Sequence, residues 1–168
     1  MLYERRQAIS VMFTTEKYKW ALTGMSKQVR NIILAFKSEV NNMNKNNALM
    51  TLKNIRSIQV SIGGQLYPLQ PMRFNTDVGD IAEHIAHIAH IEGCAEYNVE
   101  PQLSIIEFRD FYPSIFINTK AQPELLKTGN DVSVTIEKMG NEQYEVFALI
   151  NEDCYYNHNI SNGVGVFL

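Results

Sequence analysis

Short segments in which apolar and polar residues alternate recur along the chain, and they constrain its fold more than any other feature. The clearest segment covers residues 55–62, where Ile58, Val60 and Ile62 are separated by polar residues. This alternation places every second side chain on one face of an extended strand. Further strands are expected at residues 8–15, 18–22, 29–36, 114–117, 131–136, 144–150 and 164–168. The pattern predicts an all-β domain.

Two turn signals indicate how neighbouring strands connect. Gly63 and Gly64 directly follow the strand at residues 55–62. Two glycines between extended segments predict a tight hairpin, because primed turns need positive φ at their central positions. The sequence Met-Gly-Asn-Glu-Gln at residues 139–143 predicts a second hairpin, between the strands at 131–136 and 144–150. The Asn-rich residues 41–47 predict an exposed loop.

At about residues 77–92 the apolar residues repeat with the period of a helix and not that of a strand, which predicts one helix. Ile81, Ile85 and Ile88 fall within about 60° of one another at about 100° per residue, which makes one apolar stripe. Seven or eight short strands with a single inserted helix predict an antiparallel sandwich, since parallel sheets need a crossover after nearly every strand. A jelly roll is one of the few such topologies. Residues 1–168 are expected to form one jelly-roll domain.

Charge and hydropathy narrow the classes of function. The net charge of −3 provides no broad positive field for nucleic-acid phosphates, so we expect no direct nucleic-acid binding. No run approaches the roughly 18 apolar residues that span a bilayer, so membrane insertion is not expected. The N-terminal residues lack the apolar stretch of a secretory signal, which predicts an intracellular location.

The order of the predicted segments also resembles a known family. In the first half, Trp20 lies in one strand and an apolar strand at residues 29–36 follows it. The Asn-rich loop, the strand at 55–62, the turn and the sequence Leu-Tyr-Pro at 66–68 come next.

The second half continues this order. After the predicted helix, Pro113 precedes an apolar strand, Asp131 opens another, and the last apolar strand runs toward Tyr155 and Tyr156. From residue 17 to 168, the order resembles the C-terminal jelly roll of the double jelly-roll major capsid proteins of Polinton/Maverick and adintovirus-type elements. In two respects the chain differs from that family: it has one jelly roll instead of two, and its end departs from the family pattern at residues 151–158.

The resemblance implies a structural capsid or capsid-derived protein that self-assembles through contacts of the jelly-roll flanks. Its expected partners are further copies, as a trimer or higher, and other capsid subunits. It implies no enzyme, and we assign no catalytic, cofactor-binding or metal-binding residues. A virion subunit, a processed half of a longer chain and a domesticated descendant all remain open.

The histidines of the predicted helix suggest the alternative of a metal site. His84, His87 and His90 lie three residues apart, and a pair of them could hold zinc. All three spread across roughly 120° of the helix, however, so we expect them along its flank. A cupin-type metalloprotein shares the jelly-roll architecture but would carry its ligands on strands, whereas His158 lies in a polar tail.

A carbohydrate- or protein-binding module is the other alternative, with its site in the loop at residues 41–47 or the tail at 157–162. The carboxylates at Glu152 and Asp153, and at Glu142 with Glu145, are expected to be surface charge. Cys94 and Cys154 have no metal or redox spacing and are expected to be free thiols. The aromatic residues are expected to fill the core, and they are Tyr3, Phe13, Tyr18, Trp20, Phe36, Tyr67, Phe74, Phe108, Phe111 and Phe116.

Overall fold

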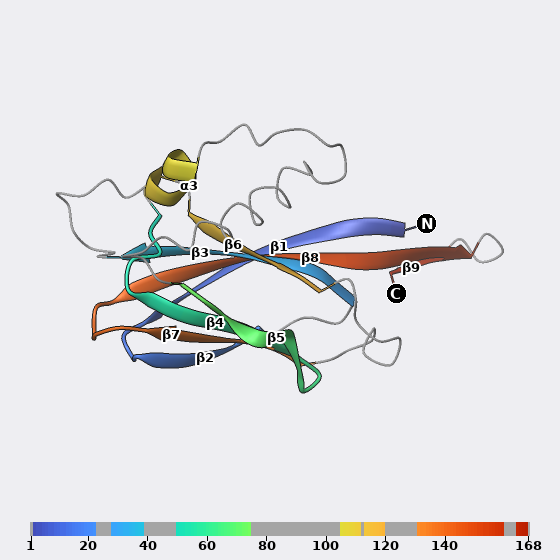
Figure 1. Ribbon diagram of the computed structural model, residues 1–168. Helices are drawn as coiled ribbons and strands as arrows, with labels where there is room; N and C mark the ends of the chain where they lie inside the picture. Colours follow the sequence, from blue (N-terminus) through green and yellow to red (C-terminus); the bar gives the residue numbers. More distant parts are fainter. Residues whose placement is uncertain are drawn as a thin grey trace.

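The computed structural model describes residues 2–22, 28–38, 50–74, 105–111, 113–119, 131–159 and 164–167. In these ranges nine strands form antiparallel sheets, and the two large sheets lie face to face (Figure 1). The elements are β1 (Leu2–Phe13), β2 (Lys17–Leu22), β3 (Gln28–Ser38), β4 (Ile55–Ile62), β5 (Gln65–Arg73), α3 (Ile105–Phe111), β6 (Ser114–Asn118), β7 (Val132–Lys138), β8 (Tyr144–Asn159) and β9 (Val164–Phe167).

The strand order is that of a jelly roll. One sheet, called sheet A here, has the order β1-β8-β3-β6, and β9 pairs with the end of β8. The other, sheet B, has the order β2-β7-β4-β5. The pairs are nested, first strand with eighth, second with seventh, third with sixth and fourth with fifth. Such a ribbon, rolled so that its strands alternate between two sheets, is a jelly roll, which confirms the predicted fold class.

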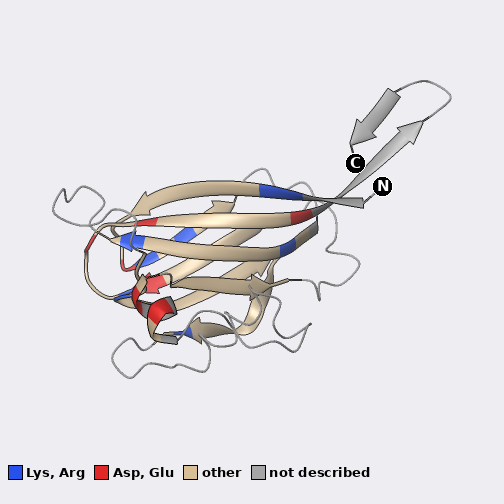
Figure 2. Ribbon diagram, turned by 90° about the horizontal axis from the view of Figure 1, so that it is seen from above, with Lys and Arg blue, Asp and Glu red and all other residues tan. Residues whose placement is uncertain are grey.

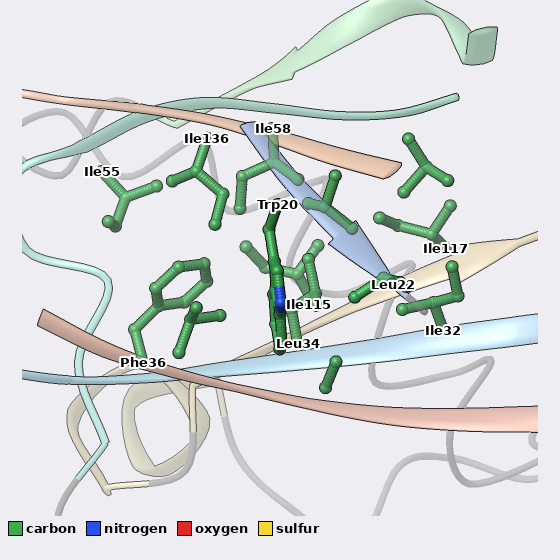
Figure 3. Packing of buried hydrophobic residues seen from close by; sticks show 14 of the residues in the cluster. Trp20, Leu22, Ile32, Leu34, Phe36, Ile55, Ile58, Ile115, Ile117 and Ile136 are labelled. Carbon is green, nitrogen blue, oxygen red and sulfur yellow. The ribbon is translucent and has the colours of Figure 1, made fainter. Parts of the chain in front are cut away.

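The core lies between the two sheets and is filled from both of them. Along β7, Val132, Val134 and Ile136 point inward and are at most 3% exposed, while the residues between them face outward. Figure 3 shows Trp20 of sheet B reaching between the sheets toward Leu34 of sheet A. Burial of one such aliphatic side chain contributes roughly 1.5–3 kcal/mol. The inward faces therefore supply most of the stability.

The predicted aromatic core is confirmed for part of the set. Phe13, Trp20, Phe36 and Phe74 are buried, and Tyr18 and Tyr67 pack against the core at its margin. Phe116 is half-buried on the outer face of sheet A, and Phe111 is 48% exposed, so neither fills the core. Tyr144, which was not in the predicted set, is fully buried, and its hydroxyl donates to the Lys53 carbonyl at 2.6 Å.

The hairpin predicted at Gly63 and Gly64 is confirmed. Ile62 pairs directly with Gln65, which leaves the two glycines as a two-residue loop between β4 and β5. Their φ values are 54° and 83°, the positive values that a type I′ turn requires.

The hairpin predicted at residues 139–143 is wrong. The strands on its two sides lie in different sheets, because β7 pairs with β2 and β4 while β8 pairs with β1 and β3. The backbone N–H of Lys138 donates to the Glu16 carbonyl, and that of Met139 donates to the Asn54 carbonyl. These bonds join the segment to the loops of other strands, so it crosses from sheet B to sheet A.

Several boundaries also differ from the prediction. β1 begins at Leu2, because its charged first half pairs with β8. β8 continues through polar residues to Asn159, so the polar tail predicted at His158 is part of a strand, with His158 opposite Gly165. The helix α3 was not predicted. The predicted helix at about 77–92 and the Asn-rich loop at 41–47 lie outside the described residues.

Candidate protein-contact surface

The outer face of sheet A is apolar where a solvated sheet would be polar. In β3, Ile32, Leu34 and Phe36 point into the core, but the outward residues Ile33 and Ala35 are apolar as well. In β8 the outward Phe147 and Leu149 follow the same pattern, and all four are half-buried. Strands that are apolar on both faces are typical of sheets covered on both sides.

The register of sheet A joins these residues into one surface, which we call the apolar band. One row across the strands runs Ala8, Leu149, Ile33 and Phe116, and the next runs Ser10, Phe147, Ala35 and Ser114. Met12, at the border of the band, is 50% exposed. Residues directly opposite one another on a face lie within about 5.5 Å between Cβ atoms, so the side chains form a continuous surface.

Charged side chains border the band at both ends. Glu145 is paired in register with Met12 on one side and with Lys37 on the other. At the opposite end, Arg6 is paired with Asn151, whose amide donates to Asn31 Oδ1 at 2.6 Å. Figure 2 looks onto this face, and the blue and red positions on its strands lie toward their ends, with a tan stretch between them. The middle of the face is therefore uncharged.

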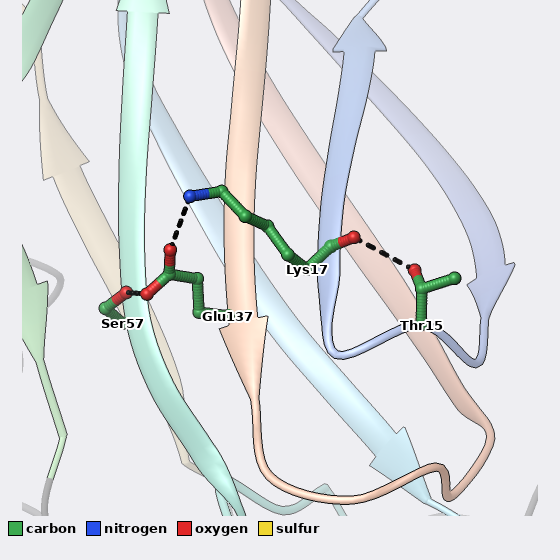
Figure 4. A network of polar contacts seen from close by, with 4 residues as sticks. All are labelled: Thr15, Lys17, Ser57 and Glu137. Carbon is green, nitrogen blue, oxygen red and sulfur yellow. Dashed lines mark hydrogen bonds and ion pairs between the residues drawn. The ribbon is translucent and has the colours of Figure 1, made fainter.

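The outer face of sheet B is polar on β2, β7 and β4, in contrast to that of sheet A, although its edge strand β5 exposes Leu66 and Leu69. Its strands present Ser57, Gln59 and Thr135, with Lys17 and Glu137 beside them. Lys17 Nζ lies 2.7 Å from Glu137 Oε1, and the Ser57 hydroxyl donates to Glu137 Oε2 at 2.9 Å (Figure 4). The hydrogen bonds from Lys17 and then Ser57 lower the pKa of Glu137 below its ordinary value of 4.5. A face of this kind is well hydrated.

Two buried polar residues, Asn151 and Glu152, lie in β8 toward one end of sheet A. Glu152 is fully buried, and Arg5 Nη1 lies 3.8 Å from its Oε2. This corrects the prediction that Glu152 is surface charge. Alternation explains the burial, because Glu152 continues the inward series that ends in apolar residues at Ile150. The pairing of β3 with β8 is irregular beside it, where the register shifts between Val29 and Asn31.

The remaining predicted residues are placed as follows. Glu142 is exposed, Glu145 is half-buried, and each accepts a hydrogen bond, from Asn54 and Ser10 respectively. Cys154 lies in β8 opposite Tyr3. The part of the chain that the structure describes does not include the predicted residues His84, His87, His90 and Cys94.

Within the ranges that the structure describes, no three His, Cys, Asp or Glu residues gather where they could hold a metal ion. None of the helices in the same ranges has the length and apolarity needed to cross a membrane.

Sequence reasoning did not identify the apolar band, although its signal was present. The runs at residues 32–36 and 146–150 are apolar without alternation. Such runs predict a strand that is buried on both faces. Only the register shows that the two runs lie side by side and that their outward residues share one surface.

No protein-family model matches this chain, and no curated protein matches its sequence. Among solved structures, the chain is similar to the major capsid protein P2 from bacteriophage PM2, with a TM-score of 0.40 and 11% sequence identity. The similarity covers 97% of this chain and 47% of the phage protein. The chain thus spans about half the length of that capsid protein.

Proposed function

We propose that this protein is a structural capsid or capsid-derived subunit that self-assembles through its jelly-roll surfaces and performs no catalysis. The apolar band is the observation that carries the proposal. The jelly-roll fold hosts capsid proteins, lectins and cupins, so the fold alone does not select among them. The surface chemistry of this jelly roll favours protein contact.

The extent of the band and the charges at its ends are consistent with a protein partner. Two rows on four strands about 4.8 Å apart, over about four residues that rise 3.3 Å each, cover roughly 250 Å². Contiguous apolar patches of a few hundred Å² are often functional. The uncharged middle and charged ends match the common anatomy of an interface, a dry centre with a polar rim.

The interior supports a structural role. The inward residues of the central strands are hydrocarbon, as at Ile58, Val60 and Val134. A cupin-type metalloprotein would carry imidazole or carboxylate ligands on such strands. Here those positions provide packing surface instead.

Among structural jelly-roll proteins, the assignment to capsid proteins rests on the order of sequence segments. That order runs from the Trp20 strand to the apolar strand that precedes Tyr155. That order is the basis for proposing a Polinton- or adintovirus-type origin, with assembly as a trimer or higher and placement in a virion or at its assembly site. Contacts with other capsid subunits would follow from the same origin.

The proposal is tested by light scattering and electron microscopy of the full chain. We expect oligomers at micromolar concentration. Leu149→Glu places a charge in the middle of the band without entering the core, so this variant should stay folded and lose the larger oligomers that the parent forms. Thr135→Glu makes a matched change on the outer face of sheet B and should assemble as the parent does. A parent chain that stays monomeric at high micromolar concentration, with no assemblies on the grid, would overturn the proposal.

A further inference from the structure

Among the strands that the structure describes, four form the edges of the two large sheets, and three of these have features that hinder pairing with another strand. β5 contains Pro68 and Pro71, which cannot donate a backbone hydrogen bond. β2 has six residues and presents Lys17 and Lys19 on its exposed side. β6 has five residues. Prolines, lysines and short length are the usual protections of a sheet edge.

The fourth edge strand, β1, has none of these protections along most of its length. It has 12 residues and pairs with β8 without any register shift. Residues 7–13 contain no proline, glycine or charged side chain. Within the described part of the chain β1 pairs with β8 alone, so its other edge faces no strand.

Burial gives an independent indication that the flank beside β1 is open. Ile9 and Val11 point inward and pack against the core, yet both are only half-buried. Their neighbours on β8, such as Ala148, are at most 1% exposed. On the opposite flank, the inward Ile115 and Ile117 of the edge strand β6 are at most 3% exposed. An added strand beside β1 would complete the burial of Ile9 and Val11.

We propose that β1 pairs antiparallel with β1 of a second copy of this chain, so that two sheets A join into one continuous sheet. This inference deepens the proposed self-assembly and rests on it. Pairing is most favourable when the uncharged stretches overlap and the partners' Arg5 and Arg6 lie beyond the paired residues. That register places Ser10 opposite Ser10 of the second copy and Ala8 opposite its Met12.

The joined sheet also extends the contact surface. Ala8 and Met12 lie on the outer face, at the β1 border of the apolar band. Pairing of β1 strands makes the two bands continuous across the dimer and doubles the apolar surface available to further subunits. Edge pairing and face packing are therefore compatible within one assembly.

Charge placed at two exposed positions of β1 tests the register. In Ala8→Lys/Met12→Lys, two lysine pairs face each other across the joint, and like charges directly opposite destabilise a sheet. We expect the dimer dissociation constant to rise at least about tenfold, measured by sedimentation. Ala8→Lys/Met12→Glu alters the same positions but opposes Lys to Glu, so it should dimerise like the parent. Ala21→Lys/Gln59→Lys adds two charges to sheet B and should have no effect.

Cross-linking provides the second measurement. Directly opposed residues of antiparallel strands have Cα atoms about 4.5–5.5 Å apart, within the range of a disulfide. With Cys94→Ser and Cys154→Ser as background, Ser10→Cys should form an interchain disulfide. A parent that assembles, combined with an unaffected double-lysine variant and no cross-link at position 10, would refute β1 pairing and leave the proposed function standing. A parent that never associates would refute the proposed function itself.

Discussion

At the scale of single residues, Glu137 shows how the polar face of sheet B depends on pH. Its pKa is lowered by the hydrogen bonds from Lys17 and Ser57, so its carboxylate stabilises the folded state at pH values above about 4.5. That contribution is lost as the pH falls through the lowered pKa. The side chain is 40% exposed, so solvent screening keeps the contribution to a few tenths of a kcal/mol.

Glu137→Gln should therefore destabilise the protein slightly at pH 7, by up to about 0.5 kcal/mol. The difference between variant and parent should shrink as the pH falls from 7 to 3, because the parent carboxyl becomes protonated as the pH passes its lowered pKa. Urea unfolding at both pH values measures it. A difference that is the same at pH 3 and pH 7 would contradict the assignment of the effect to the carboxylate charge.

Glu152 poses a different problem, because it is a carboxylate at 0% exposure with Arg5 3.8 Å away. Loss of the cation from such a pair leaves a buried charge with less compensation. Arg5→Met should cost about 1 kcal/mol or more, and Arg5→Met/Glu152→Gln should recover part of that loss. Denaturant midpoints of the single and double variants give the coupling. Purely additive effects would show that the two side chains do not interact.

At the scale of elements, the β4–β5 hairpin depends on backbone conformation alone. The Cβ of a residue at position 64 would meet nothing within 4 Å, so space is not limiting there. Gly63→Val/Gly64→Val should still cost about 2 kcal/mol or more, because β-branched residues are strained at positive φ. Gly63→Asn is the matched control, since Asn-Gly suits a type I′ turn and should keep near-parental stability. Equal melting temperatures for the double valine variant and the parent would contradict this account.

The elements also show what local pattern can predict. The strand at residues 55–62 and the Gly63 turn were predicted correctly because alternation and positive φ are local properties. The hairpin predicted at 139–143 was wrong, because turn residues alone cannot specify whether the next strand returns to the same sheet or crosses to the other. The polar end of β8 was missed because its strand conformation depends on β1 and β9, not on its own hydrophobic pattern.

At the scale of the whole molecule, the two outer faces differ in kind. On β2, β7 and β4 sheet B presents mainly hydroxyl, amide and charged groups, and sheet A presents an apolar band with charged ends. The sequence predicted the fold class, because a chain of many short strands and few helices is compatible with only a few architectures. It could not show the band, since Ile33 and Leu149 are far apart in the chain and meet only through the pairing of β3 with β8.

The nested pairing of strands has a further consequence, for the time course of folding. Among the described strands, β4–β5 and β8–β9 pair across short connections, whereas β3–β6, β2–β7 and β1–β8 each enclose the pairs before them. Closing each larger loop costs more chain entropy, and proteins dominated by such distant contacts fold in milliseconds to seconds. During synthesis, β1 leaves the ribosome long before its neighbour β8 exists. Its apolar residues must stay out of wrong associations throughout that interval, which makes the nascent chain the stage most exposed to misassembly.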